Sequence, residues 1–115
     1  MTEAERATLI GRTLQEHKSL KQHLGCLATK ADHMAQAVAE GLRLITGETT
    51  GHADGGSLIV SKTANSMMVA SCDWPSVEAI GELVAERAAT EKRLAEVEEC
   101  LRKMGMGEYV RGGDQ

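Results

Sequence analysis

The sequence predicts a mainly helical fold with a small β-hairpin, in which two long antiparallel helices form a coiled-coil-like helical hairpin joined through the central β-hairpin. Apolar residues recur at three- and four-residue steps over about residues 3–45 and 76–104, which is typical of amphipathic helices. Between them lie two short apolar runs, Leu58–Val60 and Met67–Ala70, which are typical of paired strands. The alternative is an all-α three-helix bundle, which would follow if the central stretch were helical.

Length and composition favour a single domain over residues 1–115 that does not fold as a compact globule. The chain has no Phe, one Trp and one Tyr, so its apolar content is mainly Ala, Leu, Val and Met. Such residues suit the thin seams between long helices. Thin seams bury little apolar area, and each Å² buried contributes only about 25 cal/mol. We therefore expect self-association to supply the remaining stability, and predict a homo-oligomer.

Charge and cysteine usage exclude several classes. A formal net charge of -4 argues against a nucleic-acid-binding surface, which needs clustered Lys and Arg. No apolar run approaches the roughly 18 residues of a membrane span, and the start of the chain is acidic where a secretory signal is basic. The three cysteines are widely spaced, which predicts reduced thiols rather than disulfides or structural zinc. We expect a cytoplasmic protein.

The first helix is predicted over residues 3–45. Thr2 and Glu5 have the spacing of a capping box at its start. His17 lies on the apolar stripe, where we expect it to bond a carboxylate across the seam. Gly25, in the middle of the helix, predicts either a kink or the close approach of another helix. The stripe comprises Ile10, Leu14, His17, Leu20, Leu24, Leu27, Ala31, Met34, Val38, Leu42 and Ile45.

The middle of the chain is predicted to be a loop over residues 46–56 followed by a β-hairpin over residues 57–71. The loop is polar and dense in glycine. The predicted turn of the hairpin is Lys62–Asn65. Because an isolated two-stranded hairpin is marginal in water, its edges must be covered by the helices or pair with another subunit.

The second helix is predicted over residues 76–104, with Asp73 or Ser76 as its N-cap. Trp74 either seals the junction between hairpin and helix or is exposed as an anchor for a partner. Residues 105–115 are predicted to be a flexible tail, in which Tyr109 and Val110 could dock onto a helix end. The apolar stripe of the second helix comprises Val77, Ile80, Leu83, Val84, Leu94, Val97, Leu101 and Met104, and Arg87 and Thr90 form a polar stretch in its middle.

No residues show the spacing of a nucleophile, a metal site or an acid-base pair, so we expect neither an enzyme nor a metal or cofactor. A pair formed across the fold, such as Cys72 with His52, stays open. The candidate binding residues are Trp74, Lys62, Arg43, His52 and Tyr109.

The order helix, β-hairpin, helix at this length resembles the prefoldin β-type subunit, with Gly56–Val60 similar in character to a hairpin strand there. The resemblance implies hairpins that assemble a barrel, from which coiled coils project, and a chaperone that holds unfolded proteins.

The leading hypothesis is a non-catalytic homo-oligomer that binds and occludes or scaffolds a partner protein, as small inhibitors encoded by mobile elements do. The first alternative is an oligomer that sequesters a small anionic ligand, with Lys62, Arg43 and His52 gripping it between subunits. The second is a prefoldin-like holdase.

Overall fold

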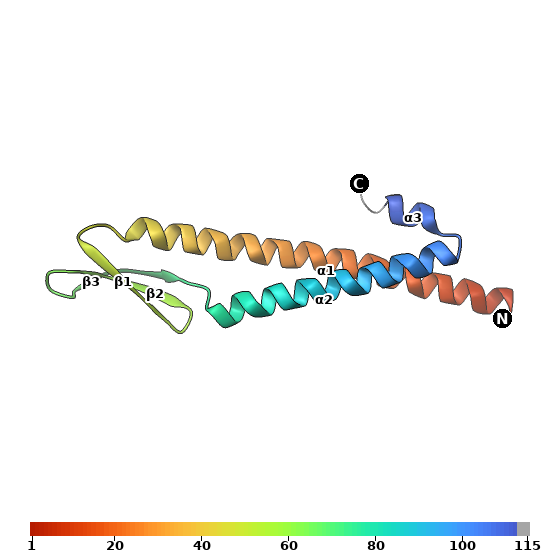
Figure 1. Cartoon of the computed structure of the whole chain (residues 1–115), viewed down its shortest axis with the longest axis horizontal. Helices are drawn as coiled ribbons and strands as arrows, with labels where there is room; N and C mark the ends of the chain where they lie inside the picture. Colours follow the sequence, from red (N-terminus) through yellow and green to blue (C-terminus); the bar gives the residue numbers. More distant parts are fainter. Residues whose placement is uncertain (113–115) are drawn as a thin grey trace. The chain divides into compact units, whose positions relative to one another are not determined.

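The computed structural model describes residues 1–112 and is mostly helical with one three-stranded antiparallel sheet (Figure 1). The chain divides into two compact units. The terminal unit consists of residues 1–27 together with those from 85 onward, and the sheet unit consists of residues 28–84. The elements of the chain, in order, are α1 (Glu3–Leu44), β1 (Thr49–Asp54), β2 (Ser57–Lys62), β3 (Met68–Asp73), α2 (Val77–Lys103) and α3 (Gly107–Gly112).

The two long helices begin where their capping residues predict. The backbone N–H of Glu5 donates to Thr2 Oγ1 at 3.1 Å, and the backbone N–H of Ala79 donates to Ser76 Oγ at 3.1 Å. Each bond satisfies a donor that the first helical turn would leave unpaired. Of the two predicted caps for the second helix, Ser76 is therefore the one that forms.

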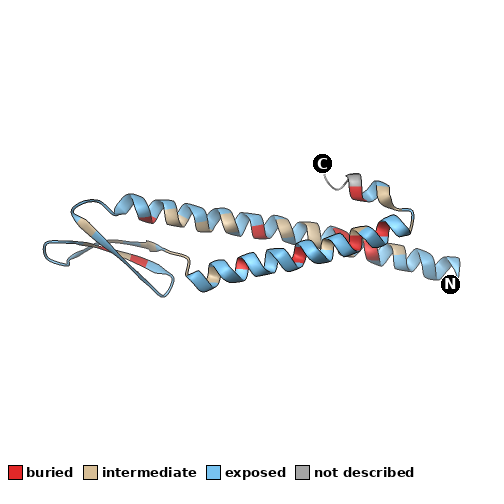
Figure 2. Ribbon diagram, in the orientation of Figure 1, coloured by how far each residue is buried: buried red, intermediate tan, exposed pale blue. Residues whose placement is uncertain are grey.

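In the terminal unit, α1 and α2 run antiparallel and bury a seam that α3 closes. His17 of α1 bonds Glu98 of α2, and Glu16 of α1 bonds Arg93 of α2, as expected for helices that run in opposite directions. Val97, Leu101 and Val110 form the buried cluster, with Leu14, Leu20 and Met106 packed against it. Figure 2 shows buried residues gathered where these helices meet. Complete burial of such a side chain contributes about 1.5–3 kcal/mol.

A short helix stands where the sequence predicts a flexible tail. Gly105 ends α2 with a φ of 80°, Met106 N–H donates to Leu101 O at 2.8 Å, and Gly105 N–H donates to Arg102 O at 3.1 Å. This pair of bonds is a Schellman motif, which reverses the chain. Val110 is buried, so its predicted docking is confirmed, and the tail prediction is wrong for α3. The rest of that prediction, residues 113–115, lies outside the described residues.

The sheet unit contains three strands in the order β1-β2-β3, so the predicted two-stranded hairpin is one strand short. The loop predicted over residues 46–56 is wrong for β1, which pairs antiparallel with β2 along its whole length. Gly55 and Gly56, with φ of 56° and 92°, form the two-residue turn that joins these strands. Because residues 58–70 contribute strands, the three-helix alternative is also wrong.

The chain turns between β2 and β3 where the sequence predicts a turn, at Lys62–Asn65. Ser66 N–H donates to Lys62 O at 2.9 Å, and Asn65 Oδ1 accepts the Met67 N–H at 3.0 Å. An irregularity between Val60 and Ser61 in the pairing with β3 leaves Val69 as the extra residue of a bulge.

One face of the sheet lies against α1. We call it the covered face: it carries Leu58 and Val60, both buried, with Cys72 opposite Leu58. A Cβ built on Gly41 of α1 would lie 2.8 Å from Leu58 Cδ2, which shows how closely the helix approaches. The other face, here the open face, carries Ile59 with His52 and Ser71 on either side of it.

Candidate functional site

The sheet unit exposes apolar side chains near the end of α1, at Leu42 and Leu44, and in two further groups on β3 and α2. On β3 and the residue before it, Met67, Met68 and Val69 are all exposed. They lie at the edge of the sheet, because the strand order places only β2 beside β3. An exposed apolar strand edge is a template for pairing with another chain.

The second apolar surface is the first two turns of α2. Val77, Ile80 and Val84 have exposed fractions of 83%, 42% and 62%, whereas Leu83 on the same turns is only 9% exposed. Residues spaced by three and four lie along one side of a helix. The three residues, which we call the α2 stripe, therefore form a continuous apolar surface beside the buried one.

The sequence assigned all of the α2 stripe to the seam between the two helices. Periodicity identifies the apolar side of a helix, but it does not say whether the surface that covers it belongs to the same chain. The extra width was visible in the sequence, since Val77, Ile80, Leu83 and Val84 together span more than one side of the helix.

Trp74 is neither fully buried nor an exposed anchor. Its backbone N–H donates to Gly56 O at 2.8 Å, which extends the β2–β3 ladder by one residue. Its ring rests on α1, where a Cβ built on Gly41 would lie 2.7 Å from Cζ3. The exposed side of Trp74 lines a groove of about 330 Å³ with Lys30 and His33, among others. The ring of Trp74 thus packs between the sheet and α1, whereas the sequence predicts that it seals the junction with the second helix.

The three cationic candidates do not converge. Lys62 and His52 lie on opposite faces of the sheet, because Lys62 is opposite Thr49 whereas His52 is opposite Ile59, and neighbouring residues of a strand point to opposite faces. Arg43 is highly exposed near the end of α1 and lies 3.8 Å from Glu40. Lys62 and His52 therefore do not face a common site within one chain.

Tyr109 belongs to the terminal unit. It is exposed on α3 and lines a shallow groove of about 310 Å³ with Leu14, His17, Lys18 and Lys21 of α1. It is thus in a different unit from the other candidates.

The polar residues of the helical seam are paired. His17 is only 6% exposed and its Nε2 lies 3.1 Å from Glu98 Oε2, which confirms the predicted bond to a carboxylate. Thr90, also buried, donates its hydroxyl to Glu86 O at 2.8 Å. Hydrogen bonds from Arg93 to Glu16 and then to Glu96 raise the pKa of Arg93 above its ordinary range. The bonds between His17 and Glu98 and between Arg93 and Glu16 join α1 to α2, whereas those from Thr90 to Glu86 and from Arg93 to Glu96 lie within α2.

The cysteines and histidines are spread over the fold. Cys72 and His52 are on opposite faces of the sheet, so the pair left open by the sequence does not form. His33 of α1, rather than His52, lines a groove together with Cys72. Within residues 1–112 no three His, Cys, Asp or Glu side chains come together in a way that could hold a metal ion.

The comparisons give no relative for this chain: no family model, no curated protein and no solved structure matches it. The resemblance to prefoldin stays a prediction. None of the helices in the described part of the chain has the length and apolarity needed to cross a membrane.

Proposed function

We propose that this chain is a non-catalytic interaction protein that works as a homo-oligomer and binds another protein, which it occludes or scaffolds. The α2 stripe carries the proposal. Complete burial of a Val or Ile side chain contributes about 1.5–3 kcal/mol, and Val77 and Val84 are left largely in water. A partner that covers the stripe recovers that free energy.

The form of the surface indicates the kind of partner. An amphipathic helix with anchors at three- and four-residue spacing docks into an apolar groove. Glu78 and Glu82 lie on the same turns as the α2 stripe. The partner that fits is a protein with an apolar groove and a basic rim, because the rim would meet these carboxylates.

Self-association is supported by a separate surface. Met67, Met68 and Val69 are exposed at the sheet edge, away from the α2 stripe in sequence and on a different element. Two independent apolar surfaces suit a protein that assembles with itself through one and holds a partner through the other. The ligand-sequestering alternative has less support, because Lys62 and His52 lie on opposite faces of the sheet.

The test compares variants as bait. The double substitution Val77→Glu with Val84→Glu places charges on the α2 stripe, and Glu78→Gln on the same turn is the matched control. A partner captured from the native host by the wild type and by the control should then be purified. Its dissociation constant should rise at least about 100-fold for the double variant, the size of effect expected when two central anchors are lost.

Equal affinity for the double variant and the wild type would contradict the proposal. Circular dichroism should show the same helix content for all three proteins, because the substituted side chains are exposed.

A further inference from the structure

The backbone hydrogen bonds of β3 show which of its groups face outward. Trp74 N–H donates to Gly56 O, so this pair is hydrogen-bonded across the ladder. Hydrogen-bonded pairs alternate along antiparallel strands, which makes Cys72 and Ala70 the next residues bonded to β2. The N–H and C=O groups of Ser71 and Asp73 therefore point away from β2, along the free edge.

The other edge of the sheet is partly covered by the chain itself. Thr63 N–H donates to Glu48 O, so the same alternation turns the backbone groups of Thr49, Gly51 and Ala53 outward. Thr49 N–H donates to Thr46 O at 3.2 Å, so one of these outward donors is already paired within the chain. The β3 edge has exposed Met68 and Val69 instead. Edge pairing is therefore favoured at β3 over β1.

We propose that β3 of one copy pairs antiparallel with β3 of a second copy, with Ser71 opposite Ser71, so that two sheets join into one of six strands. In this register Val69 of each copy lies opposite Asp73 of the other, and the outward N–H and C=O groups of the two Ser71 residues pair with each other. The inference rests on the self-association in the proposed function and names the surface that performs it.

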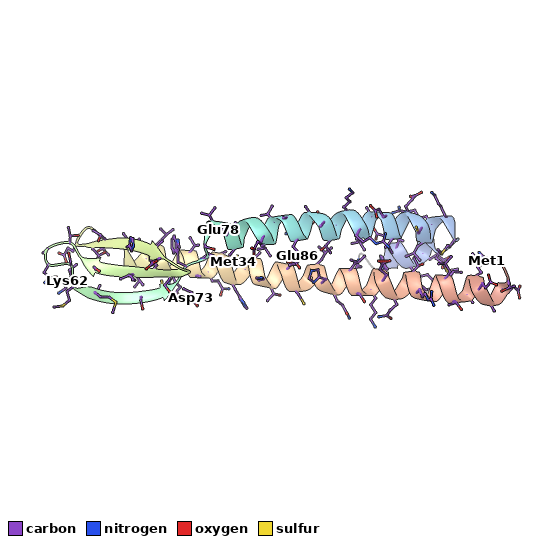
Figure 3. All side chains as sticks on the ribbon, turned by 90° about the horizontal axis from the view of Figure 1, so that it is seen from below. Met1, Met34, Lys62, Asp73, Glu78 and Glu86 are labelled. Atoms are coloured by element: carbon purple, nitrogen blue, oxygen red, sulfur yellow. The ribbon has the colours of Figure 1, made fainter. Side chains whose placement is uncertain are left out.

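Charge favours the antiparallel arrangement. Figure 3 shows Lys62 and Asp73 at opposite ends of the sheet. Asp54 lies at the same end as Asp73, because both pair with residue Ser57 of β2. A parallel pair would bring the acidic ends of the two copies together, whereas an antiparallel pair keeps Asp73 of one copy away from Asp73 of the other. Lys62 takes no direct part, since Lys62 and Asp73 lie on opposite faces of the sheet. The two-fold axis is then perpendicular to the sheet, so both covered faces lie on the same side.

The sharpest test replaces one outward-facing N–H on each edge. Ser71→Pro removes a donor from the β3 edge but no hydrogen bond within the chain, since Ser71 does not bond β2. Ala53→Pro is the matched control, because the Ala53 N–H faces outward on the β1 edge. Light scattering should show that Ser71→Pro raises the dimer dissociation constant about 30-fold, from two lost hydrogen bonds of about fivefold each, and that Ala53→Pro leaves it unchanged.

A crosslink tests the register and does not depend on how proline is tolerated. In a chain whose three native cysteines are replaced by alanine, Ser71→Cys places two thiols opposite each other across the two-fold axis. Cα atoms of a hydrogen-bonded antiparallel pair are about 5.5 Å apart, within the range of a disulfide. A mild oxidant should yield a covalent dimer of Ser71→Cys and leave Ala53→Cys monomeric on a denaturing gel.

The inference is overturned if Ser71→Pro assembles as the wild type does, or if both cysteine variants crosslink equally. If Ser71→Pro keeps its assembly while the wild type is oligomeric, this edge is not the interface, and the self-association in the proposed function stands. If the wild type itself is monomeric, that part of the proposed function falls too, whereas binding through the α2 stripe is tested separately.

Discussion

At the scale of single residues, the apolar pattern predicts that His17 has a carboxylate partner, but not which carboxylate it is. His17 falls on the apolar stripe of the sequence, and a buried imidazole needs a polar partner. Both facts predict a carboxylate across the seam, and Glu98 is that carboxylate. The sequence could not single out Glu98, because α2 carries several glutamates whose side chains depend on the rotation of the helices.

Replacing His17 by Ala should destabilise the protein by about 1–3 kcal/mol, because it removes a buried partner and leaves Glu98 without its bond. Urea unfolding followed by circular dichroism measures the change. His23→Ala is the matched control, since His23 bonds Glu86 at 2.8 Å at an exposed position and should cost less than about 0.5 kcal/mol. Equal losses for the two variants would show that burial of the His17 bond is unimportant.

At the scale of elements, the long helices and the β2–β3 hairpin were predictable, and β1 and α3 were not. The helices follow from their apolar period and caps, and β2 from a short apolar run. β1 reads Thr-Thr-Gly-His-Ala-Asp, with no apolar alternation, and becomes a strand because β2 supplies its hydrogen bonds. The available signal was Gly55-Gly56, a two-residue turn typical of hairpins.

α3 was missed because it is short and flanked by glycines. Its formation depends on Val110 entering the cluster of Val97 and Leu101, a tertiary contact that local sequence does not show. Gly25 is a second position whose surroundings the local sequence does not predict. A Cβ built there meets no described atom within 4 Å, so close approach of another helix does not explain it.

Gly41 and Gly25 make a matched pair of substitutions on α1. Gly41→Ala should destabilise the protein by about 1–3 kcal/mol, because the new methyl group would lie 2.7 Å from the ring of Trp74. Gly25→Ala should stabilise it by up to about 1 kcal/mol, since alanine favours the helix and the position is open. Thermal unfolding measures both, and the emission of Trp74, the only tryptophan, should shift in Gly41→Ala alone.

A stabilising Gly41→Ala with unchanged emission would contradict the close packing of α1 on the sheet. The pair separates packing from helix propensity, because propensity acts in the same direction at both positions.

At the scale of the whole molecule, the sequence predicts self-association better than it predicts a partner. The absence of Phe and the thin Ala, Leu and Val seams indicate that one chain buries little area. In the structure, the α2 stripe and the residues Met67–Val69 are exposed, and we propose that further chains cover them. A partner's identity depends on the shape and charge of the partner's own surface. The sequence of this chain does not predict that shape or charge.

Light scattering of the wild-type chain over a wide range of concentrations measures whether the chain self-associates. We expect a mass of at least twice that of one chain at high concentration, falling toward that of one chain on dilution as the β3 edges separate. The mass of a single chain at every concentration would contradict this expectation.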